Sequence, residues 1–233
     1  MTSDEQLFLK DPAEVQMPPA PYGILYILRQ DIYRCMGLDL KTGKQLPPPD
    51  NGLSLWPGAM AIMAGVDLLG KFFSGNDGPR TVSTNFDLFL KECFKLSSQE
   101  DRITIYQLRN SLLHSFGLYS EAQGGRIFRF SLNQTGPPIT RPIDPLDPAQ
   151  RYIVNILSLQ EEFEKAVKVY TTLLETGRDS TTLHTNFARM FPKYGSIFIG
   201  PWPPATSSAG PGQLISGASI QTATLGQSST YPR

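Results

Sequence analysis

The longest helical pattern in the chain lies between residues 153 and 174. Apolar side chains recur there at helical spacing and share one helix face, formed by Ile153, Ile156, Leu157, Leu159, Phe163, Val167, Tyr170 and Leu174. The pattern predicts a helix that begins after Asp147-Pro148 and runs to about Glu175, with Gly177 as its C-cap. An apolar face of this length must pack against other long elements, which predicts a largely helical domain.

Shorter patterns predict five more helices, over residues 22–35, 54–74, 81–96, 97–117 and 180–192. The segment RIFRFSL at 126–132 alternates in the manner of a strand, and we expect residues 139–143 to pair with it as a hairpin. The fold class is therefore mostly α: an up-and-down bundle of four to five helices with a small β-hairpin insertion and an irregular C-terminal tail.

Three regions of different composition divide the chain. Residues 1–19 end in Met-Pro-Pro and are expected to form an N-terminal arm lying on the surface. Residues 20–199 hold the periodic segments and form the bundle domain. Residues 200–233 are rich in Pro, Gly, Ser and Thr and cannot bury enough apolar surface to fold alone. This tail is expected either to be disordered or to lie over a partner subunit.

The apolar segment Trp56–Phe73 is interrupted by two charges, Asp67 and Lys71, and is short for a membrane span. Its small residues, Gly58, Ala61, Gly65 and Gly70, would allow another helix to approach closely. Asp67 and Lys71 have the spacing of an i,i+4 ion pair on the helix surface. The alternative is that Asp67 reaches the polar face of the helix predicted at 97–117.

Composition excludes some classes of function. The chain carries 21 basic and 21 acidic residues, so no global positive field attracts nucleic acid. A local patch is available in an arginine-rich stretch, which is otherwise only a solvated surface: Arg102, Arg109, Arg126, Arg129, Arg141 and Arg151. Two histidines and two scattered cysteines, Cys35 and Cys93, supply no conventional metal site. The N-terminus lacks the features of a signal peptide, so we expect a cytoplasmic, soluble protein with reduced thiols and no membrane association.

The helix predicted from Ser97 has two chemically different faces. Ser97 and Glu100 have the spacing of a capping box. Ile105, Leu108, Leu112 and Phe116 form an apolar stripe, and His114 falls nearly opposite it. Asn110 lies one turn before His114, and Arg109, at the edge of the stripe, can swing its side chain toward the polar face.

These residues, RNSLLH from Arg109 to His114, resemble the HEPN superfamily, in which an Arg is followed after four to six residues by a His within a helical bundle. The longer string YQLRNSLLHSFGLYS is similar to uncharacterised bacterial proteins of this type. Arg178 and His184 also fit the spacing. However, Arg178 follows a helix-stopping Gly177, so we prefer the Arg109/His114 pair.

The resemblance implies a metal-independent endoribonuclease without cofactors that acts as a homodimer, with one motif from each subunit in a shared cleft. It also implies a bacterial toxin or phage-defence role, with RNA and an antitoxin or other protein as partners. His114 would be the acid or base, Arg109 would bind phosphate, and Asn110 would orient the ring or bind phosphate. The expected substrate-binding residues are Arg102, Arg126, Arg129, Asp67 and Lys71. The alternatives are a non-catalytic RNA- or protein-binding module and an adaptor that binds through Trp202 in the tail.

Overall fold

The computed structural model describes residues 1–47, 52–94, 96, 98–115, 117–145, 147, 149–177 and 179–200, which are mostly helical. The helices are α1 (Ser3–Phe8), α2 (Ile24–Cys35), α3 (Leu55–Ser74), α4 (Val82–Glu92), α5 (Gln99–Ser115), α6 (Ile156–Thr176) and α7 (Ser180–Tyr194). The strands are β1 (Ala20–Gly23), β2 (Tyr119–Glu121), β3 (Ile127–Asn133), β4 (Ile139–Thr140), β5 (Tyr152–Asn155) and β6 (Ser196–Ile199). Apart from Gly200, the C-terminal tail lies outside the described residues.

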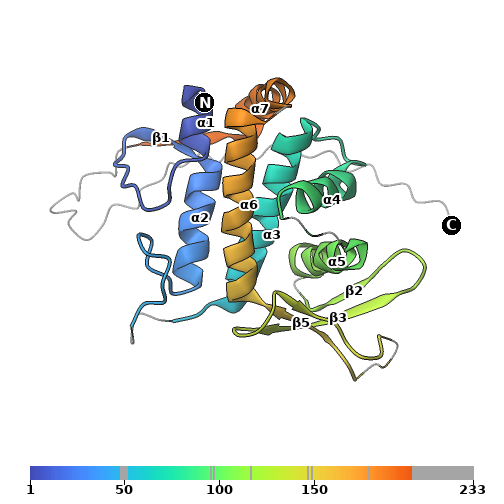
Figure 1. Ribbon diagram of the computed structural model, residues 1–233. Helices are drawn as coiled ribbons and strands as arrows, with labels where there is room; N and C mark the ends of the chain where they lie inside the picture. The colour runs from blue at the N-terminus through green and yellow to red at the C-terminus, as the bar shows by residue number, and fades with distance from the viewer. Residues whose placement is uncertain are drawn as a thin grey trace, which may run out of the picture. The chain divides into compact units, whose positions relative to one another are not determined.

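Helix α3 is the central element, because α2, α4, α5, α6 and α7 all pack against it. Figure 1 shows α2, α3 and α6 side by side, while α4 and α5 run across them. The apolar face predicted for the 153–174 segment is buried here, with Phe163, Tyr170 and Leu174 fully inaccessible to solvent. The central position of α3 explains its nearly continuous apolar sequence.

The predicted close approaches to α3 occur at its glycines. A Cβ atom on Gly65 would lie 2.6 Å from Cζ of Phe163 on α6. A Cβ atom on Gly70 would lie 2.9 Å from the backbone oxygen of Asn85 on α4. Because only hydrogen fits at these positions, the small residues set the distances between the helices.

We expect Gly70→Val to lower the free energy of unfolding by about 3 kcal/mol, since the added atoms meet backbone rather than a movable side chain. Urea unfolding would measure the loss. Gly52→Val is the matched control, because a Cβ at Gly52 meets nothing within 4 Å. Equal stability of the two variants would contradict this account of helix spacing.

The expectation of a surface arm at the N-terminus is wrong. Thr2 and Glu5 form a capping box at the start of α1. Phe8 is fully buried, with its ring stacked on Phe72 at 4.3 Å and edge-on to Phe187 at 5.4 Å. The aromatic side chain therefore anchors the N-terminal segment in the core. The Thr-x-x-Glu spacing was the sequence signal for this helix.

The predicted hairpin is also wrong in its pairing. Strand β3 forms as expected, but its neighbours are β2, which is antiparallel, and β5, which is parallel; the strand order is β2-β3-β5-β4. Strand β4 pairs with β5 instead. The helix expected to begin after Pro148 starts only at Ile156, because residues 152–155 form β5 and bury Tyr152 against Phe128 and Phe130.

Candidate functional site

Helix α5 separates a buried face from a polar one, as its sequence predicts. Ile105, Leu108 and Leu112 are fully buried, while His114 is exposed. Ser98 accepts a hydrogen bond from the backbone N–H of Asp101 at 3.3 Å and so caps the helix. Ser97 and Phe116, the residues predicted for the cap and for the end of the stripe, lie outside the described residues.

Arg109 is anchored by Asp67 of α3. Its Nε and Nη2 donate to Oδ2 of Asp67 at 2.8 and 2.5 Å. The side chains retain only 11% and 16% of their accessible surface, so little water screens the pair. Oδ1 of Asp67 is buried and accepts no hydrogen bond from a described residue. The sequence left two partners open for Asp67, Lys71 on the same helix and the polar face of α5, and the structure shows the contact with α5.

The third guanidinium nitrogen of Arg109 joins the predicted catalytic residues. Nη1 donates to Oδ1 of Asn110 at 3.1 Å and lies 2.5 Å from Nε2 of His114. An arginine can only donate, so Nε2 must be the acceptor in this contact and the ring proton resides on Nδ1. Asp67, Arg109 and His114 therefore form a continuous polar chain that ends at an exposed imidazole.

This geometry changes what Arg109 can do. The guanidinium already makes four hydrogen bonds within the chain, two to Asp67 and one each to Asn110 and His114. The guanidinium can therefore bind a phosphate strongly only if one of these partners gives way. In the arrangement seen here, Arg109 orients His114.

Lys71 does not complete the site as expected. Its Nζ lies 4.5 Å from the centre of the Tyr194 ring, a cation–π contact between α3 and α7. The i,i+4 ion pair with Asp67 is not formed, because that carboxylate binds Arg109. Lys71 therefore joins helices and is not grouped with Arg109 and His114 by any described contact.

Two of the predicted substrate-binding arginines hold elements of the fold together. Arg102 donates to Asp87 of α4 and to the backbone oxygen of Leu96, each at 2.8 Å. Arg126 forms a bidentate ion pair with Glu100 and donates to the hydroxyl of Tyr152 at 2.6 Å. The hydrogen bonds from Arg126 lower the pKa of Glu100 below its ordinary value. The third, Arg129, lies over the ring of Tyr119, with 5.9 Å between its Cζ and the ring centre.

The second histidine is used differently. Nδ1 of His184 lies 2.5 Å from Oε1 of Glu5, a carboxylate that is 1% exposed. This contact ties α7 to α1, and nothing in the sequence pairs these residues across the chain. Arg178, the other half of the alternative motif, lies outside the described residues.

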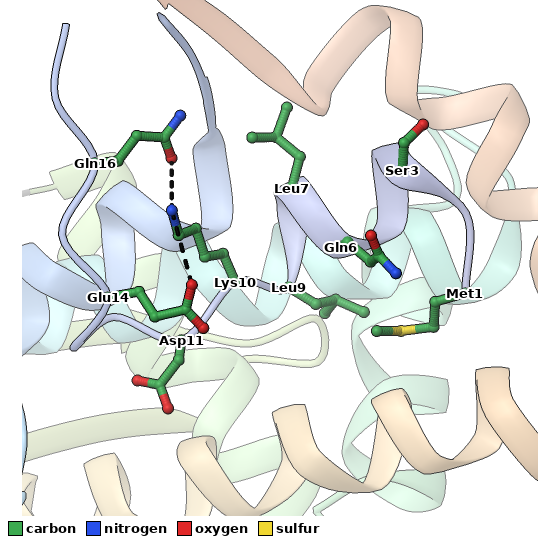
Figure 2. Close-up of a pocket in the computed structure, with 9 residues that line it drawn as sticks. All are labelled: Met1, Ser3, Gln6, Leu7, Leu9, Lys10, Asp11, Glu14 and Gln16. Atoms are coloured by element: carbon green, nitrogen blue, oxygen red, sulfur yellow. Dashed lines mark hydrogen bonds and ion pairs between the residues drawn. The ribbon is translucent and has the colours of Figure 1, made fainter.

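Three pockets of the described residues lie apart from the predicted catalytic residues. One, of about 560 Å³, is lined by residues of the N-terminal segment, and Figure 2 shows the amine of Lys10 held there between Gln16 and Glu14. A second, of about 480 Å³, is lined mostly by residues of α3, α4, α6 and α7, and a third, of about 360 Å³, lies beside Glu5 and His184. None of the three is lined by Arg109 or His114, so the site predicted from the sequence does not coincide with a pocket of the described residues.

Within the described ranges, three or more His, Cys, Asp or Glu side chains never gather closely enough to hold a metal ion. No helix of the described chain combines the length and apolarity that a membrane span requires. Both cysteines are free thiols. The fold thus defines a mostly α domain with two small sheets. No family model, curated protein or solved structure matches the chain.

Proposed function

We propose that the protein is a HEPN-like, metal-independent endoribonuclease, with α2, α3, α5 and α6 as the helical bundle of that superfamily. The observation that carries the proposal is the exposed imidazole of His114 in contact with Arg109. An acid–base group must meet solvent and substrate while keeping a fixed orientation. The polar chain from Asp67 through Arg109 provides that orientation.

The proposed reaction needs no group outside the RNA and the protein. The 2′-hydroxyl loses its proton to a base, and its oxygen attacks the adjacent phosphorus. The bond from phosphorus to the 5′ oxygen breaks, and an acid protonates that oxygen. The products are a 2′,3′-cyclic phosphate and a 5′-hydroxyl. Nε2 of His114 accepts a hydrogen bond from Arg109, so His114 acts as the base once that contact opens and frees the Nε2 lone pair for the 2′-hydroxyl proton.

The same chemistry favours a homodimer. The reaction uses both an acid and a base. Each chain has two histidines, and His184 is hydrogen-bonded to the buried Glu5, so one histidine per chain, His114, is left for catalysis. A second copy would supply a second His114 to the same cleft. Dimerisation would then be a requirement of catalysis as well as of assembly. The toxin or defence role and an antitoxin partner belong to this proposal only through the family resemblance.

We expect the full-length chain to cleave single-stranded RNA in the presence of EDTA. Mass spectrometry should find fragments that end in 2′,3′-cyclic phosphate and begin with a 5′-hydroxyl. The rate per chain should fall when dilution separates the dimer, which light scattering would follow. Absence of cleavage, or an unchanged rate for the monomer, would contradict the proposal.

A non-catalytic RNA- or protein-binding module is the second candidate, and the engagement of Arg109 favours it. A guanidinium with four protein contacts resembles a structural cross-link between α3 and α5 more than a free phosphate ligand. This candidate expects RNA binding without cleavage. The mass spectrometry experiment separates the two, because only the ribonuclease changes the RNA ends.

A further inference from the structure

The outer face of the four-stranded sheet carries a row of cationic and aromatic side chains. Strand β2 pairs with β3 so that Tyr119 lies opposite Arg129. Strands β3 and β5 are parallel, with Phe130 opposite Tyr152. Arg129 and Arg151 each come one residue earlier; Arg151 directly precedes β5, and the same register continued by one residue sets it beside Arg129. The row of Tyr119, Arg129 and Arg151 therefore runs across β2 and β3 to the residue that precedes β5.

Burial shows which face these side chains share. Along β3, Phe128 and Phe130 are buried while Arg129 between them is not, and Tyr152 is buried while Arg151 is exposed. The buried side packs toward α5, where Ser120 donates to Gln107 at 2.6 Å; Figure 1 shows the sheet beside that helix. The row thus lies on the side of the sheet that faces away from α5.

These two arginines differ from the rest of the arginine-rich stretch. Arg102, Arg109, Arg126 and Arg141 each form an ion pair with a carboxylate. Arg129 and Arg151 form none with any described residue. Glu121 is the acidic side chain on the same face of β2, diagonal to Arg129, and it makes no ion pair with a residue of the described ranges. Two like charges at neighbouring positions of a sheet are unfavourable unless an anion joins them.

The row also contains an aromatic side chain, which a nucleic-acid site needs in addition to the two arginines. Tyr119 is 48% exposed, and its ring lies 5.9 Å from the guanidinium of Arg129. Single-stranded RNA is bound by aromatic rings that stack on bases and by cations that contact the phosphates. Ile153, 39% exposed, and Thr140 extend the same face. A small inorganic anion would not use the exposed ring.

We infer that this row, Tyr119 with Arg129 and Arg151, is a platform that binds single-stranded RNA and directs the RNA toward His114. The inference rests on the proposed function for its choice of RNA as ligand. Tyr119 follows His114 by five residues, so the two Cα atoms are at most about 18 Å apart. Strand β2 is the edge of the sheet next to the end of α5. A few nucleotides could therefore pass around this edge to the imidazole.

The test measures RNA binding separately from cleavage. Full-length protein with His114→Ala would be titrated against a labelled oligouridine by fluorescence anisotropy at several salt concentrations. Adding Arg129→Ala and Arg151→Ala should reduce the slope of log K against log salt by about 0.7 for each phosphate that an arginine no longer neutralises. Adding Tyr119→Ala instead should weaken binding between about 5-fold and 150-fold.

The matched control removes two positive charges elsewhere, with Lys41→Ala and Arg80→Ala in the same His114→Ala background. Both of these side chains are exposed. Retained binding by the control, with weakened binding by the Arg129/Arg151 variant, supports the platform. The platform is overturned if the control loses as much affinity, if the sheet variants bind normally, or if the His114→Ala protein binds no oligouridine. Because binding is read without cleavage, the platform can stand when the ribonuclease proposal fails, and the reverse.

Discussion

His114→Ala is expected to lower the rate of RNA cleavage by about 10²–10⁴-fold, the usual loss when a positioned acid–base group is removed. The side chain is exposed and lies at the end of α5, so the fold should remain intact. Circular dichroism would verify the folding, and a gel assay on single-stranded RNA would give the rate. Binding of RNA should change little, because the imidazole acts on the reacting atoms.

The control for this variant is the other histidine. His184→Ala removes the contact with Glu5 and loosens α1 from α7, so it should lower the melting temperature. Below that temperature its cleavage rate should equal that of the wild type. If both variants cleave normally, His114 is not the catalytic group. If both lose activity while folded, the assignment of the catalytic group to α5 alone is wrong.

Helical periodicity predicted most helices well because their burial is continuous along one face. Leu159, Phe163 and Tyr170 recur at helical spacing and are buried by several neighbouring helices at once, so the local pattern reflects the three-dimensional core. The same argument placed Ile105, Leu108 and Leu112 correctly on α5. Periodicity in these segments left little choice of conformation.

The strands were harder to predict because their partners are distant in sequence. Strand β5 comes directly before α6, and Ile153 continues the helical pattern although it belongs to the strand. Its partner β3 ends about twenty residues earlier, so no local signal distinguished a parallel pair from the expected hairpin. The burial of Phe8 depends in the same way on Phe72 and Phe187, which are far from it in sequence.

The sequence predicted which residues form the candidate site but did not predict the function of each of them. Arg109, Asn110 and His114 lie on one turn and a half of α5, so any helix brings them together. That Arg109 is bound by Asp67 depends on how α3 crosses α5, which the sequence could offer only as one of two interpretations. The phosphate role expected for Arg109 did not take account of this partner.

Asp67→Asn tests whether Arg109 positions His114. Asparagine keeps the size of the side chain but removes the charge that pairs with a guanidinium only 11% exposed. Loss of one partner from a nearly buried pair should cost about 3 kcal/mol of unfolding free energy. If the imidazole then moves by about 1 Å, kcat should fall about 10²-fold, with a smaller effect on KM.

Nitrogen-15 chemical shifts of the His114 ring distinguish positioning from a purely structural role. In the wild type the ring proton should reside on Nδ1, and in Asp67→Asn both tautomers should be populated. Asp87→Asn is the matched control, since Asp87 also pairs with an arginine of α5 but is half exposed. That variant should lose less than about 1 kcal/mol and cleave normally. Unchanged tautomer and kcat in folded Asp67→Asn would show that the carboxylate only joins α3 to α5. A mixed tautomer together with a lower kcat would instead mean that the imidazole depends on a charge held two side chains away on another helix.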